Sequence, residues 1–185
     1  MSLFEYLMVM VSIMLGLGAT QILRGFSKIA QSPQAFLPLT MWAAVLFYIY
    51  LQFWWALWDL NTVQVWNQLQ FYFLVALPCT LFAATELLLP LGSSANTDWK
   101  GHFLSVQKWF FGVFFVFIVL SAMHTYVFLD VPLTHPYRAI QGIAVGILIA
   151  GYFAKQARTH VWLSSSLFGL VLISQIMFRF LPGLD

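Results

Sequence analysis

Six long runs of apolar residues restrict what this sequence can fold into. Each is about 18 to 24 residues long, and they lie at 3–26, 38–58, 69–91, 108–129, 137–154 and 161–181. A helix rises 1.5 Å per residue, so about 20 apolar residues span a hydrocarbon core of about 30 Å. The runs are continuous rather than alternating, which favours helices over strands. The sequence therefore predicts an all-α polytopic membrane protein, a bundle of six transmembrane helices in one domain with short loops.

The composition supports this class and argues against several others. Apolar residues make up 62% of the chain and charged residues 8%, whereas about 25% is usual in a soluble domain. A net charge of +2 without a basic stripe argues against a nucleic-acid partner. The single cysteine, Cys79, provides no disulfide framework. No phosphate-binding loop, Cys-x-x-Cys pair or His-Glu-x-x-His motif occurs. We therefore expect surrounding lipid, no cofactor, no metal and no catalytic residues.

The positions of lysine and arginine predict the orientation. Arg138 and Arg179 lie on one side of the predicted membrane. The other side carries six basic residues, in or beside the loops after the first, third and fifth runs: Arg24, Lys28, Lys100, Lys108, Lys155 and Arg158. Cytoplasmic loops carry the excess of positive charge. The sequence therefore predicts a multi-pass protein of the cell inner (plasma) membrane, with both termini on the outer side.

A weak internal similarity relates the two halves of the chain. Pro-Leu-Thr opens the second run at 38–40 and precedes the fifth run at 132–134. The third run carries Glu86 near its end, followed by a proline and a glycine. The sixth run carries Arg179 near its end, which is followed in the same way. Three helices per half would place the halves in opposite orientations. This pattern predicts a weak 3+3 inverted repeat.

The third run carries the two least expected residues, a proline and a carboxylate. Pro78 removes one helical hydrogen bond and is expected to kink the helix. Glu86 lies within the run, where a carboxylate costs about 2.5–3.5 kcal/mol on insertion scales. Counting depth at 1.5 Å per residue places Gln21 at the level of Glu86 and Arg24 one turn deeper. We therefore predict Gln21 and Arg24 as partners of Glu86, which would be a proton or cation site.

A second group of polar residues falls near the outer side. Glu5, Arg138 and Arg179 share one level, so Glu5 is expected to pair with either arginine. Gln141 lies near Arg138. Gln175 precedes Arg179 by four residues, so these two share a helical face. Ionisable groups at membrane depth indicate functional sites. The sequence predicts that these residues form an outer binding cluster with His124.

The histidines differ in their predicted surroundings. His124 lies within the fourth run, between Ser121 and Thr125 in chain order. Three roles fit it: a hydrogen-bonded buried histidine, a proton-transfer group, or a metal ligand, although no second histidine lies at matching depth. His102 and His160 fall on the cytoplasmic side, where we expect them to be solvated.

Small residues recur on two of the runs. Ser12, Gly16 and Thr20 lie four residues apart in the first run, and Gly142 and Gly146 lie four apart in the fifth. Such spacing lets another helix approach closely, and it also fits a face that lines a water-filled path. We expect the first and fifth helices to contact each other through these residues.

Three functions are compatible with these features. The first is an oligomeric channel or transporter subunit that passes or binds a small solute, ion or proton. The second is a non-catalytic accessory or scaffold subunit that docks on another membrane protein, with its polar residues serving as contacts between helices. The third is a membrane sensor, or an enzyme that acts on a lipid or quinone beside His124. Glu86, Gln21 and Arg24 facing a common cavity would favour the first function. Full pairing of these groups without any cavity would favour the second, and a lateral opening beside His124 would favour the third.

Overall fold

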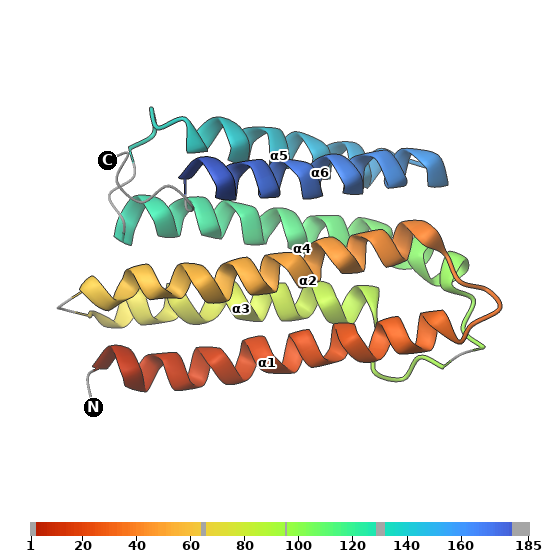
Figure 1. Cartoon of the computed structure of the whole chain (residues 1–185), viewed down its shortest axis with the longest axis horizontal. Helices are drawn as coiled ribbons and strands as arrows, with labels where there is room; N and C mark the ends of the chain where they lie inside the picture. Colours follow the sequence, from red (N-terminus) through yellow and green to blue (C-terminus); the bar gives the residue numbers. More distant parts are fainter. Residues whose placement is uncertain (1–2, 64–65, 95, 129–131, 179–185) are drawn as a thin grey trace.

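The structure is a computed structural model that describes residues 3–63, 66–94, 96–128 and 132–178. These residues form α1 (Leu3–Ala30), α2 (Leu37–Ala56), a 3-10 helix η1 (Leu57–Thr62), α3 (Gln68–Leu88), α4 (Trp99–Phe128), α5 (Tyr137–Phe153) and α6 (Ala157–Phe178). The α-helices lie side by side along the long axis of the molecule, and α1 begins at the end where α6 finishes (Figure 1). The predicted all-helical class and the six helices are confirmed for the described residues.

Five of these helices are long and apolar enough to cross a membrane: α1, α2, α3, α4 and α6. Helix α5 is apolar but has only 17 residues, so it rises about 25 Å. It nevertheless lies alongside α6 in Figure 1. Its sequence was also the shortest of the predicted spans. The length and composition of the helices therefore indicate a helical membrane protein.

The largest error in the predicted boundaries concerns α4, which begins at Trp99 rather than at 108. The carboxylate of Asp98 accepts a hydrogen bond from the Gly101 N–H at 3.0 Å, which caps the first turn. The residues after Asp98 therefore continue the helix although Lys100 and His102 interrupt the apolar pattern. At 30 residues, α4 rises about 45 Å and extends beyond its apolar segment.

Helix α3 ends earlier than predicted, at Leu88. Pro90 disfavours a helical backbone at the residue before it, and Leu89 has φ −133° and ψ 70°. Pro78 lies inside α3 without ending it, and the Thr80 hydroxyl donates to the Leu77 carbonyl at 2.8 Å.

The helices pack as a closed ring in the order α1, α3, α4, α5, α6, α2. Helix α2 also contacts α3 and α4 across the ring. Helices α1 and α5 lie at opposite edges of the bundle (Figure 1), so the predicted contact between them is wrong. The sequence spacing identified a face on each helix but not the neighbour that covers it.

The small residues of α1 also have a different role from the predicted one. Gly16 is exposed, and no described atom lies within 4 Å of the position of a Cβ there. Gly18 and Gly25 instead make the close approaches, because a Cβ at these positions would collide with Tyr50 of α2 and with Leu89. Two glycines outside the expected four-residue stripe therefore let α1 pack closely.

An aromatic cluster fills the end of the bundle where α2 and α6 begin. Trp42 lies at a ring-centroid distance of 4.9 Å from Phe111, and both side chains are buried. His160 packs at 4.9 Å from Phe103 and is only 1% exposed, so its predicted solvation is wrong. His102 is half-buried, with Nε2 3.1 Å from the Leu87 carbonyl. This end of the bundle is packed with aromatic rings rather than open to water.

Candidate solute-binding cavity

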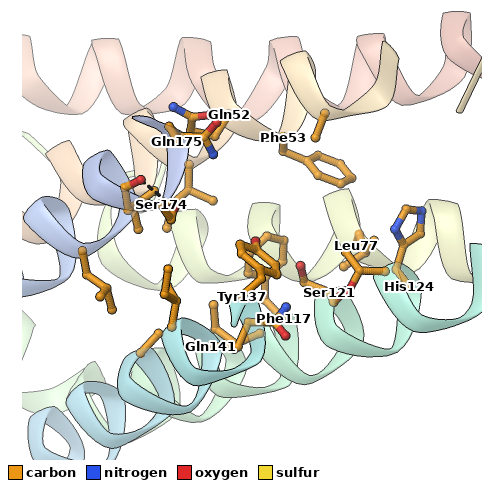
Figure 2. Close-up of a pocket in the computed structure, with 18 of the residues that line it drawn as sticks. Gln52, Phe53, Leu77, Phe117, Ser121, His124, Tyr137, Gln141, Ser174 and Gln175 are labelled. Carbon is orange, nitrogen blue, oxygen red and sulfur yellow. Dashed lines mark hydrogen bonds between the residues drawn. The ribbon is translucent and has the colours of Figure 1, made fainter. Parts of the chain in front are cut away.

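A cavity of about 130 Å³ lies among α2, α4, α5 and α6, in the half of the bundle where α1 begins. Most of its surface is apolar, contributed by residues that include Ile49, Phe53, Leu57, Leu77, Phe117, Ile118, Ile140, Ala144, Leu170 and Val171. Its polar lining residues are Gln52, Ser121, His124, Thr125, Tyr137, Gln141, Ser174 and Gln175. Figure 2 shows Gln52 and Gln175 on one wall, with Ser121, Tyr137 and Gln141 on the facing wall.

Helical spacing explains why each element presents several residues to this cavity. On α4, Ser121, His124 and Thr125 lie at i, i+3 and i+4, which places them on one face. On α5, Tyr137, Gln141 and Ala144 follow the same rule. Gln52 and Ser174 come from faces of α2 and α6 that the ring of helices turns inward.

Arg138 sets the orientation of Gln141. One terminal nitrogen of Arg138 donates to Gln141 Oε1 at 2.8 Å, to Thr125 Oγ1 at 2.8 Å and to the Ala122 carbonyl at 2.9 Å. Arginine only donates hydrogen bonds, so the Gln141 atom that faces it must be the carbonyl oxygen. The amide NH₂ of Gln141 is thereby left as a donor for a ligand. Arg138 thus acts behind the wall of the cavity as a positioning residue.

The cavity suits an uncharged ligand. Among the described lining residues, none is an aspartate, glutamate, lysine or arginine. A cation in such surroundings would lose its hydration without gaining a compensating negative charge, and the positive charge of Arg138 is already bound by Gln141 and Thr125 behind the wall. The space holds one small organic molecule, since an engineered apolar cavity of about 150 Å³ binds benzene. The side-chain amides and hydroxyls would hydrogen-bond its polar atoms, and the aliphatic wall would contact the rest.

The predicted outer cluster is assembled only in part. His124, Gln141 and Gln175 line this cavity together, and Arg138 binds Gln141 from behind. Glu5 is exposed on α1, a helix that contributes no described residue to the lining. Arg179 lies outside the described residues, so its predicted pairing stays untested.

Glu86 and Gln21 form a separate polar cluster, which we call the Gln21–Glu86 cluster. The Gln21 side-chain amide donates to Glu86 Oε2 and, at 2.8 Å, to the Leu89 carbonyl. Glu86 Oε1 accepts from the Leu91 N–H at 3.3 Å. The predicted pairing of Gln21 with Glu86 is therefore confirmed. These bonds join α1 to the turn that follows α3.

The predicted pairing of Arg24 with Glu86 is wrong. Arg24 is exposed, and the described residues show no ion pair between the two side chains. Lys28, one turn further along α1, instead donates to the Leu91 carbonyl at 3.0 Å and to Ser93 Oγ at 3.4 Å. Gln21 and Arg24 were predicted to lie one turn apart in depth, but of these two only Gln21 faces the turn after α3. Glu86, Gln21 and Arg24 also do not line the cavity described above.

Several site residues were absent from the sequence-based set. Gln52 and Ser174 line the cavity, and Tyr137 was taken only as the start of a span. The sequence did carry a signal for two of them. Tyr137 precedes Gln141 by four residues, and Ser174 is the neighbour of Gln175 in the chain. The sequence carried no such signal for Gln52, because no other polar residue of the described cavity lining comes from the same helix.

The described residues hold no group of three histidine, cysteine, aspartate or glutamate side chains that is arranged to ligate a metal ion. Comparisons with protein-family models, with curated proteins and with solved structures find no match to this chain.

Proposed function

We propose that this protein is a membrane transporter or channel subunit that binds a small uncharged solute in the cavity among α2, α4, α5 and α6. The supporting observation is that polar side chains from four helices converge on one cavity within the apolar part of the bundle. Such convergence is the usual property of a binding site for a small molecule. The solute, rather than an ion, is the proposed cargo, because the described lining carries no acid or base apart from His124.

This proposal gives Glu86 a structural role instead of the solute-binding role expected from the sequence. Both of its carboxylate oxygens accept hydrogen bonds, from Gln21 and from the backbone of Leu91. These bonds offset the free-energy cost of placing the carboxylate in an apolar region. An ion site at Glu86, Gln21 and Arg24 remains a prediction that Glu86→Gln would test.

Transport would require the aromatic cluster at the other end of the bundle to rearrange. Trp42, Phe111 and Phe114 are packed against each other there and are almost completely buried. Their close packing would oppose the passage of a solute from the cavity toward that end. We propose that this cluster is the closed gate of the pathway and that the cavity opens toward the other side of the membrane.

The proposed topology has six crossings in a cell inner (plasma) membrane, with both termini outside. It is supported by the antiparallel packing of α5 with α6 and by the basic residues at the end of the bundle away from the start of α1. We also propose the inverted repeat, since the helices of the two halves contain 28, 20 and 21 residues and 30, 17 and 22 residues in order. Assembly into a homo-oligomer or with another membrane protein is part of the same proposal.

A second candidate function is binding of a lipophilic single-ring molecule such as a quinone. His124 and the Gln141 amide are hydrogen-bond donors that suit ring carbonyls, and the lining beside them is largely apolar. An engineered apolar cavity of about 150 Å³ binds benzene, so a ring fits a space of this order. Binding without transport would favour a sensor or enzyme.

Flux through reconstituted liposomes separates these functions. Glycerol is the uncharged probe for the solute-transport function, and the rate of osmotic swelling of the liposomes measures its entry. We expect wild-type protein to accelerate swelling over empty liposomes, and Ser121→Phe, which fills the cavity, to remove most of that increase. Ser165→Phe is the matched control, because Ser165 is exposed on α6 outside the lining.

The second candidate function is tested by measuring the thermal unfolding of the same protein samples with and without a short-tailed benzoquinone. Stabilisation that Ser121→Phe abolishes, without any glycerol flux, would replace transport by ring binding. If neither probe acts on wild-type protein, the cavity proposal is wrong and the accessory-subunit function takes its place.

A further inference from the structure

A second hollow lies on the outside of the bundle, between α4 and α5. Its volume is about 330 Å³, and its lining is almost wholly apolar: Phe111, Gly112, Phe115, Leu148, Ile149, Tyr152 and Phe153. Gly112 is one of the lining residues, and a Cβ added there would meet open space rather than a neighbouring helix. The groove shares no lining residue with the cavity described above, although Leu148 follows the cavity residue Ala144 by one turn of α5.

A positive charge lies at the rim of this groove. The ammonium group of Lys108 is 6.0 Å from the centre of the Tyr152 ring, and Tyr152 lines the groove. Lys108 precedes Gly112 by four residues and so shares its face of α4. Lys155 follows the lining residue Phe153 by two residues and is exposed. The groove is therefore hydrophobic along its length and basic at the end that the sequence places at the cytoplasmic surface.

We propose that this groove binds one anionic phospholipid, with an acyl chain against Gly112 and the headgroup phosphate beside Lys108 and Lys155. Basic residues beside grooves between transmembrane helices suit anionic headgroups at the cytoplasmic surface. Lysine is a compact, mobile point charge that pairs with a phosphate without a fixed geometry. The apolar lining offers no hydrogen-bond partner for the lipid headgroup. The headgroup is therefore expected at the end with Lys108, and the acyl chain along the groove.

The dimensions favour a lipid chain over a helix of another subunit. The lining covers 111–115 on α4 and 148–153 on α5, which correspond to rises of about 6 and 7.5 Å. A packed helix is about 10–12 Å wide and contacts its neighbours over several turns. A groove of this length accommodates a segment of hydrocarbon chain. The groove shares no lining residue with the proposed solute cavity, although Phe111 belongs both to the groove and to the proposed gate.

Native mass spectrometry of the detergent-purified protein tests this lipid site. The probes are dioleoyl phosphatidylglycerol, which is anionic, and dioleoyl phosphatidylcholine, which has the same chains and no net charge. We expect the first bound lipid to be phosphatidylglycerol in preference to phosphatidylcholine. Lys108→Gln should reduce this preference about fivefold, since one basic residue near the surface contributes about 1 kcal/mol. Lys100→Gln, an exposed lysine earlier on α4, should leave it unchanged.

Filling the groove gives the second arm of the experiment. Gly112→Leu should abolish the first binding event for both lipids, because the leucine side chain would occupy the groove without displacing a described neighbour. Gly16→Leu is the matched control, since Gly16 has equally open surroundings on α1 at the opposite edge of the bundle. Equal affinity of wild-type protein for the two lipids would overturn the proposal. It would also be overturned if Gly112→Leu retained the lipid, or changed only the oligomeric mass, which would make the groove a protein contact.

Discussion

At the scale of single residues, the contrast between Gly16 and Gly18 shows how closely α1 packs. Two positions apart, one glycine has open surroundings and the other lies against the ring of Tyr50. The Tyr50 hydroxyl is itself 3.2 Å from Thr85 Oγ1 on α3, so the ring is held in place from the other side. Space at Gly18 is therefore a requirement of the contact among three helices.

We predict that Gly18→Ala destabilises the protein by about 1–3 kcal/mol, the usual cost of overpacking a filled core. The added methyl group would displace Tyr50 and break its hydrogen bond with Thr85. Thermal unfolding in detergent measures the effect. Gly16→Ala, at an exposed helical position with open surroundings, should not lower the unfolding temperature. An equal response of the two variants would show that α1 does not lie against Tyr50.

The Gln21–Glu86 cluster gives a second prediction at this scale. Gln21→Leu should cost about 1.5–3 kcal/mol, because Glu86 loses a donor to its carboxylate and the Leu89 carbonyl loses its partner. Combining it with Glu86→Leu should cost less than the sum of the two single changes. A double-mutant cycle of unfolding free energies measures this coupling. Additive costs would contradict the pairing.

At the scale of the helix, the end of α5 depends on a side chain from α4. The Gln107 amide donates to the carbonyls of Gly151 at 2.8 Å, Tyr152 at 3.3 Å and Ala154 at 2.7 Å. The last carbonyls of a helix have no partner within it, so a buried side-chain donor satisfies them. Gln107 therefore ties the last turn of α5 to α4 by hydrogen bonds to carbonyls that the helix itself leaves without partners.

We therefore predict that Gln107→Leu loosens the last turn of α5 and lowers the unfolding free energy by about 1–3 kcal/mol. Amide hydrogen exchange should become faster at the end of α5, and tryptic cleavage after Lys155 should increase. Gln156→Leu is the control, because Gln156 is exposed in the adjoining turn. Unchanged exchange in α5 would show that Gln107 does not cap this helix.

The sequence was sufficient for the helices but not for their ends or neighbours. Continuous apolar runs required six helices, whereas α4 begins earlier because Asp98 caps a first turn whose surface is polar. Depth counting found the Gln21–Glu86 pair, since both helices run in the same direction from known starting points. It failed for Arg24, because depth along the axis does not specify the direction in which a side chain leaves the helix.

At the scale of the whole molecule, the two ends of the bundle differ in how they are filled. Aromatic rings such as Trp42 and Phe111 close one end. Polar side chains including Gln52, His124 and Gln141 surround open volume toward the other. The residues of this cavity come from both halves of the chain, so no local motif in the sequence could predict it. The packing of α2 against α6 and α4 brings Gln52 to the residues of the second half.

The most direct test of the central claim is whether a solute occupies this cavity. In a Cys79→Ser background, a thiol introduced by Ser121→Cys would line the cavity, and one introduced by Ser165→Cys would lie outside it. Methyl methanethiosulfonate, a small uncharged reagent, modifies each thiol at a measurable rate. We predict that glycerol slows modification at position 121 and leaves the rate at position 165 unchanged. An equal effect of glycerol on the two rates would contradict solute binding in the cavity.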